Sequence, residues 1–87
     1  MPKEIQGFFN DEGKLEIWPS KPAKKRAVLT YIALKFNSGQ NYSEKEVNEI
    51  IKAQCDYNDH VLLRRELFGH KILDRTIDGR KYWKVAI

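Results

Sequence analysis

Residues 58–71, NDHVLLRRELFGHK, contain a helix start signal, an apolar stripe, two adjacent arginines and a helix stop signal. A short polar residue, Asp56 or Asn58, can accept a backbone N–H as the N-cap. Gly69 can adopt the left-handed conformation that closes many helices. The stretch is therefore predicted to form a helix of about three turns.

The two arginines of this helix are expected to point in different directions. At 3.6 residues per turn, Arg64 falls within the arc of apolar side chains, whereas Arg65 points to the other side, near Leu62 and Asn58. Guanidinium groups are rarely buried alone, so we expect Arg64 to lay its stem on the core and to pair with a carboxylate. Arg65 is then free to contact a partner.

A second helix is predicted upstream, over residues 42–55, YSEKEVNEIIKAQC. Ser43 and Glu46 form an S-x-x-E capping box, in which each side chain accepts a hydrogen bond from a free backbone N–H. Glu44 and Asn48 lie one turn apart and are placed to hydrogen-bond the arginines of the next helix, fixing how the two helices cross. We expect a structural polar network of three residues: Glu44, Asn48 and Arg64.

A β-hairpin is predicted over residues 72–87, ILDRTIDGRKYWKVAI. The Asp-Gly dipeptide at 78–79 is a strong signal for a short hairpin turn. A two-residue turn pairs Arg75 with Tyr82 and places Ile72, Trp83 and Val85 on the core face, which leaves Leu73 on the other face.

The order of helix, short turn, helix and basic hairpin is that of a winged helix-turn-helix, whose second helix enters the DNA major groove. Helical spacing of apolar residues predicts another helix over residues 20–37, and turn signals predict a small hairpin over residues 5–18. The predicted fold is α+β: a winged-helix-like three-helix core with a C-terminal β-hairpin wing and an N-terminal β-hairpin. Residues 1–87 are expected to form a single domain.

The net charge of +4 is distributed unevenly. Residues 21–37 carry five cations and no carboxylate, and residues 72–87 carry four cations against two carboxylates. Both groups would flank the recognition helix of a winged helix, where they could meet phosphates. The candidate phosphate contacts are Lys24, Lys25, Arg26, Arg80 and Lys81. The alternative is a solvated surface that keeps the protein in solution.

The sequence gives little support to catalysis or metal binding. Cys55 with His60 or His70 is the available nucleophile and base combination, and no motif supplies an oxyanion hole. The spacings typical of zinc and calcium sites are missing, as is a glycine-rich phosphate loop. We therefore predict no enzyme, no catalytic or metal-binding residue, no cofactor and no small-molecule substrate.

The sequence also indicates the cellular compartment in which the protein is expected. No apolar run approaches the length that crosses a bilayer, and the first residues lack an apolar signal region. The single cysteine fits a reducing compartment. A cytoplasmic protein with no membrane partner is expected.

Four segments resemble motifs of a known prokaryotic family. They are WPSKPAKKRAVL at 18–29, FNSGQNYSEKEVNEII at 36–51, LLRRELFGHKILDR at 62–75 and DGRKYW at 78–83. Over about residues 14–84 the chain resembles the domain of unknown function 2087 family, whose members occur alone or joined to helix-turn-helix transcriptional regulators. The resemblance implies a transcription-related role and no enzymatic activity.

Two functional hypotheses follow. The first is a transcription-regulatory module that binds double-stranded DNA, with base contacts from three residues: Asn58, Leu62 and Arg65. The second is a protein–protein interaction module of the same fold that binds a protein partner or forms a homodimer. Residues 56–71 carry equal numbers of cations and carboxylates, which favours the second hypothesis, as would an exposed apolar patch around Leu62 and Phe68.

Overall fold

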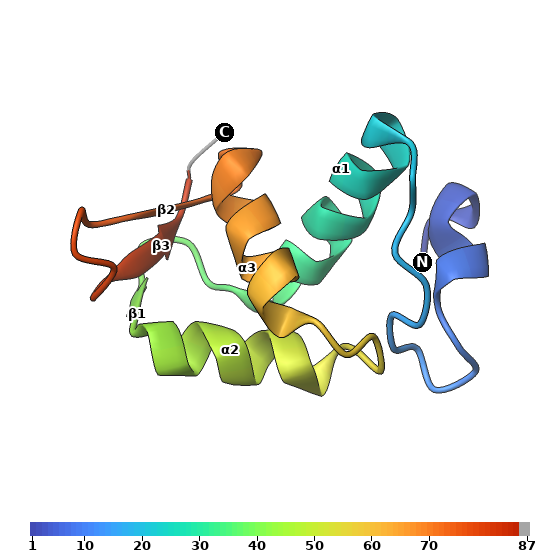
Figure 1. The fold of residues 1–87 in the computed structure, drawn as a ribbon, viewed down its shortest axis with the longest axis horizontal. Helices are drawn as coiled ribbons and strands as arrows, with labels where there is room; N and C mark the ends of the chain where they lie inside the picture. The colour runs from blue at the N-terminus through green and yellow to red at the C-terminus, as the bar shows by residue number, and fades with distance from the viewer. Residues whose placement is uncertain (86–87) are drawn as a thin grey trace.

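The computed structural model describes residues 1–85 and has a small α+β fold (Figure 1). The α-helices are α1 (Pro22–Ile32), α2 (Glu44–Ala53) and α3 (His60–Gly69). The strands of one antiparallel sheet are β1 (Asn41–Tyr42), β2 (Leu73–Arg75) and β3 (Tyr82–Lys84). Two 3₁₀ helices, η1 (Lys3–Phe8) and η2 (Ala33–Lys35), complete the described elements. The sheet lies at one end of the molecule and η1 at the other, with the α-helices between them.

The sheet has the strand order β1-β3-β2. The β2–β3 hairpin pairs Arg75 with Tyr82, so the predicted register is confirmed. Strand β1 was not predicted, and it pairs Tyr42 with Tyr82 on the other edge of β3. Residues 86–87, at the end of the predicted second hairpin strand, lie outside the described residues.

The hairpin turns a different face to the core from the one predicted. Leu73 is fully buried and Tyr82 is 4% exposed, whereas Trp83 is only half-buried. Alternate residues of a strand point to opposite faces, so burial of Tyr82 directs Trp83 outward. The expectation of Trp83 on the core face is therefore wrong, whereas Ile72, expected on the same face, is buried.

The core is built from the apolar stripes of all three α-helices. Leu29, Ile32 and Ala33 of α1 and η2 are buried, as is Phe36 directly after η2. Side chains of α2 and α3 pack against them, and these are Val47, Ile51, Leu63 and Leu67. Burial of these stripes against one another is the main source of stability for short helices of this kind.

The start of α2 contains the predicted capping box. The Glu46 backbone N–H donates to Ser43 Oγ at 3.1 Å, and the Ser43 N–H donates to Glu46 Oε1 at 2.9 Å. The backbone bond from Ser43 and then the Ser43 side-chain bond lower the pKa of Glu46 below its ordinary value of 4.5. Because Tyr42 belongs to β1, the helix begins two residues later than predicted.

The helix α3 begins and ends at other residues than those predicted. Its N-cap is Asp59, whose Oδ1 accepts the Leu62 N–H at 3.0 Å, and neither Asp56 nor Asn58 caps it. Asp59 is the acidic residue immediately before the helical run, so its carboxylate reaches the N–H three residues on.

The C-terminus of α3 closes without a left-handed glycine. Lys71 adopts a positive φ of 60°, whereas Gly69 is the last helical residue. The Ile72 N–H donates to the Leu67 carbonyl and the Lys71 N–H to the Phe68 carbonyl, both at 3.0 Å. This pair of bonds is the Schellman closure, here formed around a lysine.

The predicted N-terminal hairpin is replaced by η1, a turn and an isolated bridge. The Gly13 N–H donates to the Asn10 carbonyl at 2.9 Å, so the predicted turn is present, and Phe9 pairs with Leu15. The backbone of Leu15 also bonds the chain between α2 and α3, including the Gln54 carbonyl at 2.8 Å. Ile5 of η1 is fully buried and belongs to the core.

Within residues 1–85, no helix combines the length and the apolar character that a bilayer crossing requires.

Candidate functional site

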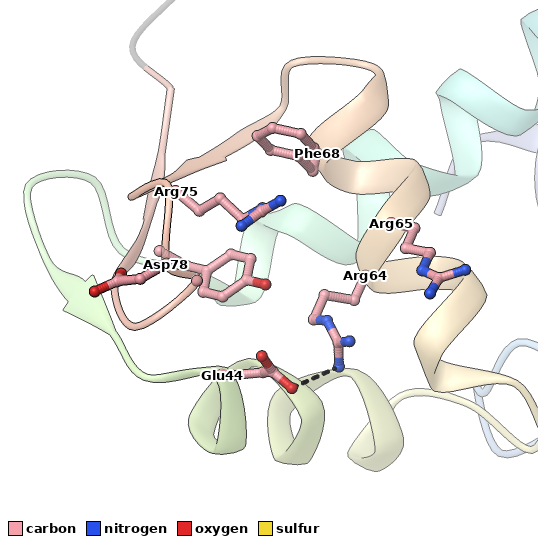
Figure 2. Close-up of a pocket in the computed structure, with 8 residues that line it drawn as sticks. Glu44, Arg64, Arg65, Phe68, Arg75 and Asp78 are labelled. Carbon is pink, nitrogen blue, oxygen red and sulfur yellow. Dashed lines mark ion pairs between the residues drawn. The ribbon is translucent and has the colours of Figure 1, made fainter.

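A pocket of about 270 Å³ lies between α3, the β2–β3 hairpin and the start of α2 (Figure 2). Its lining consists of charged side chains around two aromatic rings and a glycine: Glu44, Arg64, Arg65, Phe68, Arg75, Asp78, Gly79 and Tyr82. These residues come from three segments that are separated in the sequence. The pocket therefore exists only when the hairpin is packed on the helix pair.

Arg64 joins α3 to α2. Its Nη1 donates to Asn48 Oδ1 at 2.6 Å and lies 3.6 Å from Glu44 Oε1, which is an ion pair. The Arg64 side chain is 15% exposed, and that of Glu44 is 52% exposed. The structure thus brings together the three residues of the predicted polar network, at the crossing of the two helices.

Arg75 lies on the opposite wall of the pocket, on β2. Its Nη1 donates to the Thr76 and Ile77 carbonyls, each at 3.3 Å. Its guanidinium lies over the Phe68 ring at 4.8 Å from the centroid, a cation–π contact. Phe68 is 39% exposed, so this contact lies at the surface of α3. These contacts hold Arg75 in one orientation.

Sequence reasoning did not select Arg75 or Phe68 as site residues. The predicted pairing of Arg75 with Tyr82 was the available signal, because it places Arg75 on the same face of the hairpin as Tyr82. Deducing its contact with Phe68 also requires knowing how the hairpin lies against α3.

Arg65 is exposed on α3, as predicted. Within residues 1–85 its side chain forms no hydrogen bond or ion pair with the protein, and Figure 2 shows it projecting from the helix away from Arg64. Leu62, one turn earlier, is half-buried, and Asn58 is exposed in the connection between α2 and α3. Of the three candidate base contacts, Arg65 has the most freedom to reach a ligand.

The tip of the hairpin is polar and open to solvent. Asp78 accepts hydrogen bonds from the Thr76 hydroxyl at 2.6 Å and from the Arg80 N–H at 3.1 Å, and these bonds, in that order, lower the pKa of its carboxyl. Arg80 Nε lies 3.6 Å from Asp78 Oδ2 in an exposed ion pair, and Lys81 is exposed beside it. Both candidate phosphate contacts of the hairpin therefore lie at the surface.

The cations of α1 contact other parts of the protein. Lys24 Nζ donates to the Glu4 carbonyl at 3.2 Å, and Lys25 Nζ lies 5.9 Å from the centre of the Trp18 ring. Arg26 Nη1 donates to the carbonyl of His70, just after α3, at 3.0 Å. The structure therefore directs Lys24 and Lys25 to the N-terminal segment, and only Arg26 to the neighbourhood of α3.

Cys55 lies at the end of α2 and is half-buried. Burial, and secondarily the charge of Asp56, raises the pKa of its thiol to about 11. A thiol with a raised pKa is mostly protonated at neutral pH and is a poor nucleophile. Within residues 1–85, no group of three or more His, Cys, Asp or Glu side chains is arranged to hold a metal ion.

Comparison with protein families gives a match over most of the chain. No curated protein and no solved structure matches this chain. Residues 14–84 match the family described as "Uncharacterized protein conserved in bacteria (DUF2087)". The matched range contains the three α-helices, the sheet and all the residues that line the α3–hairpin pocket. The chain therefore belongs to the DUF2087 family of bacterial proteins.

Proposed function

We propose that this protein is a winged-helix-like DNA-binding module that regulates transcription. In this proposal α3 lies in the major groove and the β2–β3 hairpin is the wing on the phosphate backbone. One observation carries the proposal: Arg65 is exposed on α3, and the hairpin packs against that same helix through Arg75 and Phe68. A recognition helix needs a free side chain for the bases and an adjacent basic element for the phosphates.

The order of the elements supports the proposal. The chain runs α1, β1, α2, α3, β2, β3, and β3 pairs with both β1 and β2. This is the order expected of a winged helix, with α2 and α3 as the helix-turn-helix pair. The remaining α1 packs on the core, on the other side of α3 from the sheet in Figure 1.

The proposed base contacts come from the exposed side of α3 and the residues before it. Arg65 has five N–H donors and can bind guanine O6 and N7 in a bidentate manner. Asn58 can bind adenine in the same way, and the half-buried Leu62 can contact a thymine methyl group.

The proposed phosphate contacts divide into two groups. Arg80 and Lys81 are exposed at the hairpin, whereas Lys24 and Lys25 are directed to the N-terminal segment. Arg26 reaches the end of α3. We therefore expect the hairpin cations to contribute more of the backbone affinity than the α1 cations do.

The test measures fluorescence anisotropy with labelled duplexes of differing sequence at about 50 and about 200 mM salt. Arg65→Ala should reduce discrimination between sequences. Lys81→Ala should weaken all sequences alike and reduce the salt slope by about 1. The matched control is Lys3→Ala, which removes one charge from η1, at the end of the molecule away from the sheet. Affinity that is independent of salt, or is reduced equally by Lys3→Ala and Lys81→Ala, would contradict the proposal.

The alternative function is that of a protein–protein interaction module, binding a protein partner or a second copy. Ile77 at the hairpin tip is fully exposed, so its side chain is available for burial against a partner. The equal numbers of cations and carboxylates in residues 56–71 also suit a protein partner. Sedimentation velocity of the wild type and of Ile77→Ser tests the homodimer directly, since a dimer built on the tip should dissociate in the variant.

A further inference from the structure

We propose that the α3–hairpin pocket is a phosphate-binding site in which Arg64 and Arg75 are the principal ligands and Arg65 lies at the rim. Figure 2 shows the Arg75 guanidinium projecting from β2 toward α3, and the Arg64 guanidinium projecting from α3 toward Glu44 at the start of α2; both line the pocket. A phosphate group between them would be bound from two directions.

The two guanidinium groups are fixed before any ligand binds. Arg64 is held by Asn48 and Glu44, and Arg75 is held by two backbone carbonyls and the Phe68 ring. Most of the rotamer entropy that an arginine loses on binding a ligand has therefore already been lost in folding. Surface lysines with free side chains would not offer this advantage.

Both guanidinium groups keep donors for a ligand. A guanidinium carries five N–H groups, and the contacts of Arg64 and Arg75 with residues 1–85 use only Nη1 of each. The remaining Nε and Nη2 groups can form parallel pairs of hydrogen bonds with an oxyanion. A tetrahedral phosphate has enough oxygens to accept from both arginines at once, whereas a carboxylate has only two.

The carboxylates of the pocket leave a net positive charge. The pocket is lined by three arginines and two acids. Asp78 is engaged by Thr76 and by the Arg80 backbone, and Figure 2 shows its carboxylate turned away from the arginines. Glu44 is the competing anion, but it is half exposed and 3.6 Å from Arg64.

Gly79 keeps the pocket open. A Cβ at this position would lie 3.3 Å from Arg75 Nη1, 3.8 Å from Glu44 Oε2 and 4.0 Å from the Tyr82 hydroxyl. The absence of a side chain therefore leaves space beside the Arg75 guanidinium.

Two sources could supply this phosphate group. The first is the DNA backbone, and this possibility rests on the proposed function. The second is a free phosphate ion or a small phosphorylated molecule. The chemistry is the same for both. The experiment follows the arginine Nε–Hε signals of the full chain by NMR during titration with inorganic phosphate at constant ionic strength, with chloride as the reference salt. Saturable shifts at Arg64 and Arg75, with little change at the tip residue Arg80, are expected.

A matched pair of variants tests the site by a gain in affinity, which misfolding would not produce. Glu44→Gln removes the competing anion and should tighten phosphate binding about threefold to tenfold, because the repulsion between nearby charges is lost. Glu49→Gln makes the same change of net charge at an exposed position of α2 outside the pocket lining, and should leave affinity unchanged. Equal effects of the two variants, or shifts that are linear and the same in chloride, would overturn the proposal.

Addition of short duplex DNA to the phosphate-loaded protein identifies the source. Displacement of phosphate by the duplex supports a backbone-phosphate site. Duplex binding without displacement supports a site for a free phosphate group. If the duplex binds but phosphate never saturates the pocket, the phosphate site is overturned while the DNA-binding proposal stands.

Discussion

Arg64 holds its charge in a position where its side chain is only 15% exposed. Removing a guanidinium from water is costly unless hydrogen bonds and an opposite charge compensate. Asn48 supplies a hydrogen bond and Glu44 supplies the opposite charge, but the two contacts differ in strength. The hydrogen bond to Asn48 is short at 2.6 Å. The ion pair with the half-exposed Glu44, at 3.6 Å, is weakened by solvent.

A double-mutant cycle between Arg64→Ala and Asn48→Ala should give a coupling free energy of about 1.5–3 kcal/mol, the range for a hydrogen bond to a charged group. The measurement is the free energy of unfolding in urea for the wild type, both single variants and the double variant. The cycle between Arg64→Ala and Glu44→Ala should give roughly 1 kcal/mol or less. Additive effects in the Asn48 cycle would show that this bond does not hold the helix crossing.

At the scale of the element, the end of α3 is strained at Lys71. A non-glycine residue in the left-handed region costs about 1–2 kcal/mol, and Lys71 has a φ of 60°. Lys71→Gly relieves this strain, but glycine also gives the unfolded chain more conformational entropy, which offsets part of the gain. The free energy of unfolding should therefore rise by roughly 0.5–1 kcal/mol. Urea unfolding checks this, with Lys71→Ala as the control that removes the charge but keeps the strain. A Lys71→Gly variant no more stable than Lys71→Ala would refute it.

The capping box of α2 makes stability depend on pH. The pKa of Glu46 is lowered in the folded state, so its contribution is present above pH 4.5 and is lost as the pH falls below that value. Glu46→Gln keeps an oxygen for the Ser43 N–H but does not titrate, so its stability should fall less steeply on acidification. Glu49→Gln, at an exposed position on the same helix, should follow the wild type. Parallel acid curves for the wild type and Glu46→Gln, from urea unfolding at a series of pH values, would contradict this prediction.

The elements that could be predicted from the sequence are those specified by neighbouring residues. The capping box of Ser43 and Glu46 acts within one helical turn, and the pairing of Arg75 with Tyr82 spans a short loop that contains the Asp-Gly dipeptide. Strand β1 has two residues and exists because β3, some forty residues later, pairs with it. The 3₁₀ helix η1 likewise depends on burial of Ile5 against distant residues. Such elements carry no local signal.

At the scale of the whole molecule, the candidate site is assembled from segments that are far apart in the sequence and are predicted as separate elements. The periodicities of α2 and α3 were sufficient to propose a network of Glu44, Asn48 and Arg64, because both helices were predicted and adjacent helices pack antiparallel or crossed. The contact of Arg75 with Phe68 depends on the packing direction of the hairpin, which no motif specifies. The exposure of Arg65 followed from helical geometry alone.

The most direct test of a DNA-binding face on α3 and the hairpin is an NMR titration of the full chain with a short mixed-sequence duplex at low and at physiological salt. The amides of α3 and residues 75–82 should shift at low salt, less so at the higher salt, because phosphate contacts release counterions. The amides of η1, at the other end of the molecule, should stay unchanged. No shifts at low salt, or shifts centred on the N-terminal segment, would contradict the DNA-binding proposal.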